Sequence, residues 1–262
     1  MAKKIDPKAI VGSKAKIADN VEVGPYAIIS DDAQIGSGTK IEPFAQVLGQ
    51  TKVGSNCHIF SQAVVGSIPQ DLKYKGERSY LVVGDNNRIR EFVTINPGTE
   101  KDAKTIIGNN NLIMAYSHIA HDCVIGDENV LANGATLAGY VDVGNNVVVG
   151  GLVAIHQFCQ LGDHSIVGGC SKVVQDVPPY SMCDGHPAIV RALNSIGLKR
   201  KNFSSSAIKD LKKAFKILFF SDHSFDQAKK ITGETIGSVE QVKFLLGFIS
   251  NSKRGIGRRQ DK

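Results

Sequence analysis

An aliphatic residue recurs every six residues along most of this chain, and no other feature restricts its fold as strongly. Counting in sixes from Ile5 gives Ile, Val or Leu at every position through Val65, at 83, 89 and 95, and from Ile107 through Val173. These 26 positions fit neither the 3.6-residue period of a helix nor the alternation of an isolated strand. A period of six is typical of a parallel β-helix, so we expect an all-β solenoid of hexapeptide repeats.

Each hexad is expected to form one short strand and a turn, with three hexads in each coil. The large aliphatic side chain fills the interior, and a small residue four places later packs inside near the corner. This pattern places Cys57, Cys123 and Cys159 in the core. Glycine often follows the aliphatic residue, as at Gly36 and Gly54, and we expect it there because glycine adopts turn dihedral angles barred to other residues.

Two segments lack the repeat, and both are predicted to be loops extruded from the coil. They are residues 66–82 and 99–105. Loops on a rigid scaffold often carry functional residues, so the stretch PQDLKYKGE in the first is a candidate substrate loop, although a tolerated insertion is the plain alternative.

The repeat stops after residue 173, and the pair Pro178-Pro179 cannot continue a β ladder. Serine caps and apolar spacing predict helices over 204–222 and 238–252. We therefore divide the chain into a β-helix domain, residues 1–187, and a basic α-helical domain, residues 188–262.

Charge is distributed unevenly between these two parts. From residue 190 onward there are 16 Lys and Arg against 6 Asp and Glu, whereas residues 1–189 carry 15 against 19. A C-terminal excess of +10 suggests an acidic partner, which could be nucleic acid, an anionic membrane surface or an acidic protein. Without a secretory signal, a membrane-spanning apolar run or a CxxC pair among the five cysteines, we expect a reduced, cytoplasmic protein.

Polar residues gather on one part of the repeat, in the stretch SHIAHDC. Residues three hexads apart lie one rung apart, about 4.8 Å, so His121, Gly139 and Gln157 should form one outward-facing column. The neighbouring column contains Asp122, Tyr140 and Phe158, and two further histidines, His118 and His156, lie within two or three rungs.

This arrangement suits acyl transfer without a serine or cysteine nucleophile. Neutral His121 can take a proton from an attacking hydroxyl, Asp122 can fix its tautomer, and the N–H of Gly139 can stabilise an oxyanion. Hexapeptide β-helices can also hold zinc with three histidines, as in the gamma-class carbonic anhydrases. The histidine spacing here does not reproduce that arrangement, and no metal is expected.

Eight segments, in this order, resemble the UDP-N-acetylglucosamine acyltransferases, the first enzymes of lipid A biosynthesis: PQDLKYKGE, IREFVTIN, LIMAYSHIAHDC, LAGYV, HQFCQLGD, VGGCS, QDVPPYS and GLKRKNF. The resemblance covers essentially the whole chain. It implies a homotrimer of left-handed β-helices with active sites in clefts between subunits and with no cofactor. It also implies transfer of an (R)-3-hydroxyacyl group from an acidic acyl carrier protein to the 3-position of UDP-N-acetylglucosamine.

The resemblance also assigns roles to individual residues. It implies that His121 is the general base, with Asp122 beside it and Gly139 as the oxyanion donor. The implied substrate contacts are Gln70, Asp71 and Lys73 in the extruded loop, Asn96, His118, Tyr140, His156 and Gln157 along the cleft, and Asn194, Arg200 and Lys201 at the uridine and diphosphate.

Acyl-chain length is the role implied for Gly169, where a larger side chain in the family shortens the accepted chain. The separation of His121 and Gly169 by eight hexads corresponds to about 13 Å along the axis, which leaves room for about ten carbons before the level of Gly169. Because glycine does not block passage beyond this level, we expect acyl chains of about 12 carbons or more.

Several alternatives stay open. Tyr140 replaces a histidine common in the family, and Asn96-Pro97 and Ile196 also depart from its pattern, so the acceptor could be the 3-amino analogue of the sugar. The chain could also be another hexapeptide-repeat acyltransferase. A non-enzymatic scaffold that binds nucleic acid is less favoured, because the chain has no Trp and its Phe residues lie mainly at apolar helix positions.

Overall fold

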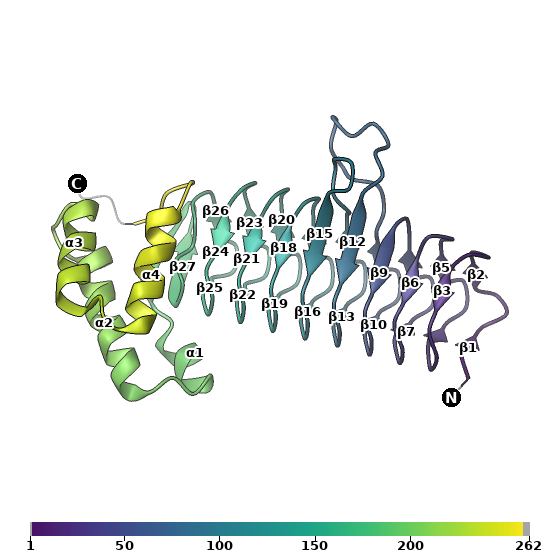
Figure 1. The fold of residues 1–262 in the computed structure, drawn as a ribbon, viewed down its shortest axis with the longest axis horizontal. Coiled ribbons are helices and arrows are strands. Elements are labelled where there is room, and N and C mark those ends of the chain that lie inside the picture. Colours follow the sequence, from purple (N-terminus) through teal and green to yellow (C-terminus); the bar gives the residue numbers. More distant parts are fainter. Residues whose placement is uncertain (1, 259–262) are drawn as a thin grey trace.

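The computed structural model describes residues 2–258, which form a long parallel β-solenoid with helices at its C-terminal end (Figure 1). The predicted fold class is thus confirmed. Three parallel sheets make the sides of the solenoid, and nearly every strand is only two residues long.

Strands follow one another from sheet to sheet, so each coil contributes one strand to each side. The first sheet contains β1 (Lys4–Ile5), β4 (Glu22–Val23), β7 (Lys40–Ile41), β10 (His58–Ile59), β13 (Arg88–Ile89), β16 (Leu112–Ile113), β19 (Val130–Leu131), β22 (Val148–Val149), β25 (Ile166–Val167), β27 (Ser181–Gly185) and β28 (Ala188–Leu193). The second contains β2 (Ile10–Val11), β5 (Ile28–Ile29), β8 (Gln46–Val47), β11 (Val64–Val65), β14 (Thr94–Ile95), β17 (His118–Ile119), β20 (Thr136–Leu137), β23 (Ala154–Ile155) and β26 (Lys172–Val173). The third contains β3 (Lys16–Ile17), β6 (Gln34–Ile35), β9 (Thr51–Val53), β12 (Tyr80–Val83), β15 (Lys104–Ile107), β18 (Val124–Ile125), β21 (Asp142–Val143) and β24 (Gln160–Leu161).

The register confirms three hexads in each regular coil. Ile119 pairs with Leu137, and Leu137 pairs with Ile155. Two coils are longer, because Val53 pairs with Val83 and Val83 with Ile107, so that the partners lie five and four hexads apart instead of three.

The extra residues of these two coils form the extruded loops, which end earlier than predicted. Strand β12 begins at Tyr80 and β15 at Lys104, so residues 80–82 and 104–105 belong to the third sheet and not to loops. Both strands are four residues long because the returning chain pairs before it reaches the aliphatic position.

The interior is a continuous aliphatic column. The hexad residues from Val23 to Val173 are buried, and Cys57, Cys123 and Cys159 are buried beside them as predicted. Burial raises the pKa of the Cys123 thiol to about 12, so this cysteine stays protonated and acts as a small core residue.

The expected reason for the repeated glycines is wrong. Gly36 and Gly54 do not have positive φ; instead, a Cβ on Gly54 would lie 2.5 Å from the carbonyl oxygen of Gly84 in the next coil. Glycine is needed because adjacent coils approach closely. The left-handed turn dihedrals fall on the fourth residue of the hexad, such as Asp122 and Tyr140, both with φ of 59°.

Buried asparagines join successive coils inside the solenoid. The backbone N–H groups of Asn111, Asn129 and Val147 donate to the side-chain oxygens of Asn87, Asn111 and Asn129, over 2.9, 2.8 and 2.7 Å. These bonds satisfy backbone donors that the short strands leave unpaired, and such donors are unfavourable when buried without a partner.

The solenoid continues past its prolines. Strand β27 pairs in parallel with β25, and β28 returns antiparallel to β27. Residues 188–193, placed by prediction in the helical domain, therefore extend the first sheet.

Helices cover this end of the solenoid: α1 (Ser195–Arg200), α2 (Ser205–Phe220), α3 (Phe225–Ile236) and α4 (Glu240–Asn251) (Figure 1). Helices α2 and α4 lie within the two predicted segments. Ser204 caps α2, and Ser224 with Gln227 forms a capping box at the start of α3. Within residues 2–258 no helix has the length and apolar character needed to span a bilayer.

The close approach of the coils predicts opposite effects for two glycine substitutions. Gly54→Ala should lower the free energy of unfolding by about 1–3 kcal/mol, because its Cβ would overlap the backbone of Gly84. Gly233→Ala, in α3 with open space around it, should raise it by about 0.5–1 kcal/mol. Urea denaturation followed by circular dichroism measures both, and a tolerated Gly54→Ala would contradict this account.

Candidate active site

One corner of the solenoid carries both insertions and the central histidine. Residues 66–79 follow β11, residues 96–103 follow β14, and His121 follows β17 in the same sheet. Figure 1 shows the inserted segments rising from one side above β12 and β15. We call the turns at residues 121–122, 139–140 and 157–158, with the two inserted loops, the histidine corner.

His121 points outward from the coil but is well covered, with only 12% of its side chain exposed. Its Nδ1 lies 2.9 Å from Oδ2 of Asp122. Because a carboxylate can only accept, Nδ1 donates in this bond, and in the neutral ring the lone pair then lies on Nε2. Asp122 also accepts bonds from the backbone N–H and the hydroxyl of Thr99, at 3.1 and 2.7 Å, which fix the carboxylate in place.

Gly139 lies directly under the imidazole. A Cβ at this position would overlap Cε1 of His121, so only glycine leaves room for the ring. The N–H of Gly139 donates to no acceptor among residues 2–258. Prolines occupy the same hexad place at Pro7, Pro25 and Pro43, so the ladder does not need this N–H, and it is available to a ligand.

The cavity beside His121 has a volume of about 630 Å³. It is lined by Asp71, Lys73, Glu77, Thr99, Glu100, Lys101, His121, Tyr140, Gln157 and Phe158. Oδ2 of Asp71 lies 3.7 Å from Nε2 of His121, so the extruded loop brings a second carboxylate near the other ring nitrogen.

Tyr140 forms one wall of this cavity. Its ring meets His121 edge to face at 5.3 Å and stacks on Phe158 at 5.0 Å. Its hydroxyl lies 3.2 Å from Oγ1 of Thr99, so the loop, the tyrosine and the Asp122 carboxylate form one network.

His118 lies on the outer face of β17, near His121. Its Nδ1 is 2.7 Å from the hydroxyl of Thr94. Burial lowers the pKa of His118 below its usual 6.5, and the neighbouring His121 lowers it further, so His118 is neutral at pH 7.

Three further predicted residues, Asn96, Gln70 and His156, lie outside the lining of this cavity. Asn96 is buried beneath the extruded loop, where its amide donates to Ser67 and to the carbonyl of Ile68. Gln70 is exposed on that loop, and His156 is exposed beside Gln157.

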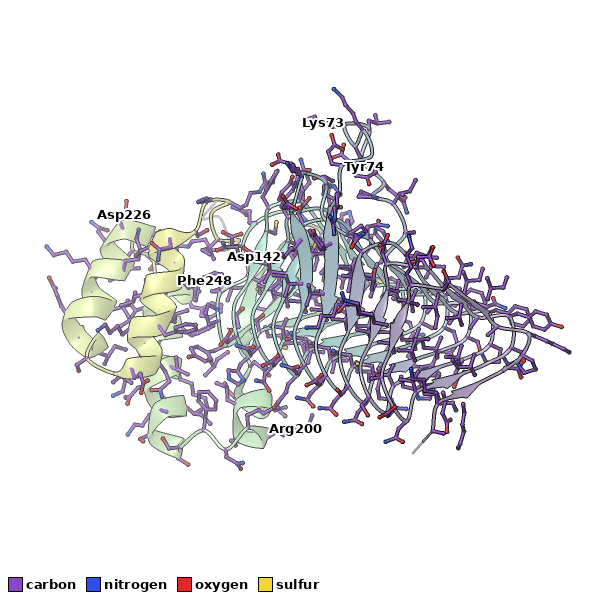
Figure 2. All side chains as sticks on the ribbon, turned by 45° about the vertical axis from the view of Figure 1, so that its right-hand side comes forward. Lys73, Tyr74, Asp142, Arg200, Asp226 and Phe248 are labelled. Atoms are coloured by element: carbon purple, nitrogen blue, oxygen red, sulfur yellow. The ribbon has the colours of Figure 1, made fainter. Side chains whose placement is uncertain are left out.

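Asn194, Arg200 and Lys201 lie at the corner that follows the third sheet. Asn194 caps α1 and donates to the carbonyl of His164, and Lys201 pairs with Glu128. Figure 2 places Arg200 beside the helices, far from Lys73 on the extruded loop. Gly169 lies at the remaining corner, the one that follows the first sheet, against Gly151. A single chain thus gathers the catalytic candidates but not these four residues.

Sequence reasoning missed Thr99, Thr94 and Arg254. Thr99 and Arg254 lie outside the repeat, and no spacing connects them to the histidine corner. Thr94 could have been found, because it lies one rung before His118 in the same sheet once the second insertion is subtracted.

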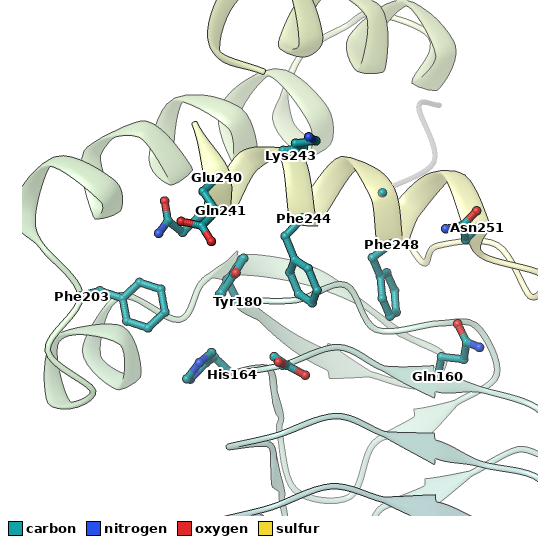
Figure 3. A pocket seen from close by; sticks show the side chains of 12 residues that line it. Gln160, His164, Tyr180, Phe203, Glu240, Gln241, Lys243, Phe244, Phe248 and Asn251 are labelled. Carbon is teal, nitrogen blue, oxygen red and sulfur yellow. The ribbon is translucent and has the colours of Figure 1, made fainter. Parts of the chain in front are cut away.

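A second, larger cavity of about 760 Å³ lies between α4 and the end of the solenoid. Figure 3 shows Phe244 and Phe248 pointing from α4 toward the level of His164 and Tyr180. The rings of His164 and Tyr180 stack at 5.9 Å and pack against Phe203, so this region joins helices to solenoid. Its lining includes His164, Asp163 and Glu240, but among residues 2–258 no carboxylate is hydrogen-bonded to the imidazole of His164 as Asp122 is to that of His121.

The fold and the histidine corner define a hexapeptide-repeat acyltransferase. The family described as bacterial transferase hexapeptide (six repeats) matches residues 32–67 and 104–139. The second domain of the UDP-N-acetylglucosamine O-acyltransferases matches residues 176–257.

Whole-chain relatives agree. The acyl-[acyl-carrier-protein]--UDP-N-acetylglucosamine O-acyltransferase of Campylobacter lari is 46% identical over 261 residues, 99% of this chain and 98% of the relative. That of Thiobacillus denitrificans is 46% identical over 255 residues, covering 97% and 99%. The solved LpxA of Acinetobacter baumannii is 42% identical with a TM-score of 0.93, covering 97% and 99%. The chain belongs to the UDP-N-acetylglucosamine O-acyltransferase family.

The depressed pKa of His118 predicts a pH-dependent stability. Its pKa is 6.5 when unfolded and lower when folded, so below pH 6.5 the unfolded state binds more protons. The free energy of unfolding should be highest above pH 6.5 and should fall as the pH drops through the folded pKa, by at most about 1.4 kcal/mol per pH unit for one proton. His118→Gln should remove this component in denaturation curves at pH 5 to 8. His164, whose pKa is also lowered, should keep its own contribution.

Proposed function

We propose that this protein transfers an (R)-3-hydroxyacyl group from acyl carrier protein to the 3-position of UDP-N-acetylglucosamine, the first step of lipid A biosynthesis. The relatives' names supply the substrate classes. The observation that carries the mechanism is the imidazole of His121, oriented by Asp122 and lying against Gly139, whose N–H has no acceptor among residues 2–258.

The reaction is a direct transfer. Nε2 of His121 takes the proton of the sugar hydroxyl as its oxygen attacks the thioester carbon, and a C–O bond forms. The N–H of Gly139 donates to the oxyanion of the tetrahedral intermediate. Collapse breaks the C–S bond, and the imidazolium returns the proton to the leaving thiolate of the carrier.

Two carboxylates lie beside the ring nitrogens of His121. Asp122 holds Nδ1–H, and Asp71 lies 3.7 Å from Nε2. Coulomb attraction to these carboxylates acts on the positive charge that the ring carries once it has taken the proton of the hydroxyl.

We further propose that the working form is a homotrimer. Asn194, Arg200, Lys201 and Gly169 lie at corners of the same chain that His121 does not share. These residues can act on the same substrate only if a second subunit places its corner against the histidine corner. The basic C-terminal part would then meet the acidic carrier protein, with electrostatic steering of their encounter.

The 3-amino analogue of the sugar is the second candidate acceptor. Tyr140 occupies the cavity wall, and its hydroxyl is engaged with Thr99, so it offers less to a sugar hydroxyl than a free imidazole would. Initial rates with the two acceptors in competition, on the same carrier-linked donor, decide between them.

Removing the base tests the mechanism. His121→Ala should reduce kcat by about a hundredfold or more while the protein keeps its far-ultraviolet spectrum and thermal transition. His223→Ala, an exposed histidine in the helical end, is the matched control and should keep full activity. A His121→Ala variant with normal turnover would refute the proposed role.

Filling the space at Gly169 tests the acyl-chain proposal. The wild-type protein should prefer donors of about 12 carbons or more, and Gly169→Met should shift this preference to shorter chains. A competition assay with a series of hydroxyacyl carrier proteins measures the shift. Cys170→Met, at the exposed neighbouring residue, should leave the preference unchanged. A wild-type preference for 10-carbon donors would contradict the proposal.

A further inference from the structure

The segment 252–257, which follows α4, crosses back over the end of the solenoid. It is anchored by Asp176, a carboxylate that is only 2% exposed. Oδ2 of Asp176 accepts from the Ser252 hydroxyl and from the backbone N–H of Arg254, and the Asp176 N–H donates to Gly255 over 2.8 Å. The other oxygen accepts from the N–H of Gln160 in β24. The backbone at Arg254 is therefore fixed to the solenoid.

From this anchor the Arg254 side chain reaches the second sheet. One terminal nitrogen lies 3.2 Å from the carbonyl oxygen of Val174 and 3.2 Å from Nδ1 of His156. The residue after His156, Gln157, lines the cavity beside His121. A residue 98 positions away in sequence thus contacts the edge of the proposed active site.

Nδ1 of His156 faces two groups with opposite requirements. The carbonyl oxygen of Gln157, also 3.2 Å away, can only accept and would favour a proton on Nδ1. The guanidinium of Arg254 can only donate and requires a lone pair there. Arginine is always charged, and charge-assisted hydrogen bonds are roughly twice as strong as neutral ones, so the arginine determines the tautomer.

We propose that Arg254 is a positioning residue that holds His156 in the Nε2–H tautomer, so that the exposed ring presents a donor to an oxygen of the nucleotide-sugar. This inference rests on the proposed function only for the identity of the ligand. Nε2 of His156 has no hydrogen-bond partner among residues 2–258, and the side chain is exposed beside the cavity. Without Arg254 the proton moves to Nδ1, where it bonds to Gln157, and Nε2 becomes an acceptor that repels phosphate and carbonyl oxygens.

Two readouts on the full-length protein test this inference. Two-bond nitrogen–proton couplings in protein labelled with ¹⁵N-histidine report the tautomer of His156, which is assigned by its loss in His156→Gln. Steady-state kinetics with saturating carrier-linked donor give KM for UDP-N-acetylglucosamine and kcat separately. The variants are Arg254→Met, which is close in size but cannot donate, and Lys253→Met, which removes a positive charge from the same segment without touching His156.

Arg254→Met should move His156 to the Nδ1–H tautomer and raise KM for the nucleotide-sugar on the order of tenfold, with kcat changed by less than about threefold. Lys253→Met should change neither. In a His156→Gln background, Arg254→Met should have no further effect on KM, because the two residues act through one contact. This double variant also reveals a merely structural loss, which would persist without the histidine.

An unchanged tautomer in Arg254→Met overturns the inference, as does a changed tautomer with an unchanged KM, or an effect on KM that survives in the His156→Gln background. Failure of the proposed function gives a different result, since the wild-type protein would then not turn over UDP-N-acetylglucosamine, while the tautomer measurement would still decide whether Arg254 controls His156.

Discussion

The parallel pairing of each strand with the one three hexads further on is the interaction on which the rest of this structure depends. Each coil lies about 4.8 Å from the next, which forces glycine wherever backbones approach most closely and fills the interior with one column of aliphatic side chains. Because this register is strict, side chains that point outward are also placed in columns. The spacing that buries Ile119 over Leu137 also places the imidazole of His121 over Gly139.

The two inserted loops add side chains to the histidine corner that the regular columns of the solenoid do not provide. Both leave the solenoid after strands of the second sheet, so they rise at the corner where His121 lies. Thr99 from one loop holds the Asp122 carboxylate, and Asp71 from the other faces Nε2 of His121. An outward-pointing histidine on a solenoid without loops would be solvated. Beside these loops the side chain of His121 is only 12% exposed, and its electrostatic interactions are stronger than they would be in water.

The regular columns of the solenoid can be predicted from the sequence, whereas the contacts made by the inserted loops cannot. The repeat, the buried cysteines and the His121–Gly139 column follow from a fixed period, and counting was enough to find them. The prediction for the glycines is wrong because the hexad shows where glycine occurs but not whether a positive φ or the close approach of two coils requires it. Thr99 and Arg254 reach the site from segments without a period, and β28 joins the sheet beyond Pro178-Pro179, so only the folded chain reveals them.

The corner also shows how a structural repeat could provide the proposed oxyanion donor without breaking the pairing of its strands. The third residue of a hexad uses its N–H in no ladder bond, which is why Pro7, Pro25 and Pro43 are tolerated there. Glycine at position 139 has no side chain, and the ring of His121 occupies the space where a Cβ would lie. The proposed oxyanion donor is therefore a backbone group that takes no part in the pairing of the coils. Acyl transfer needs only an imidazole one rung away and a carboxylate to orient it.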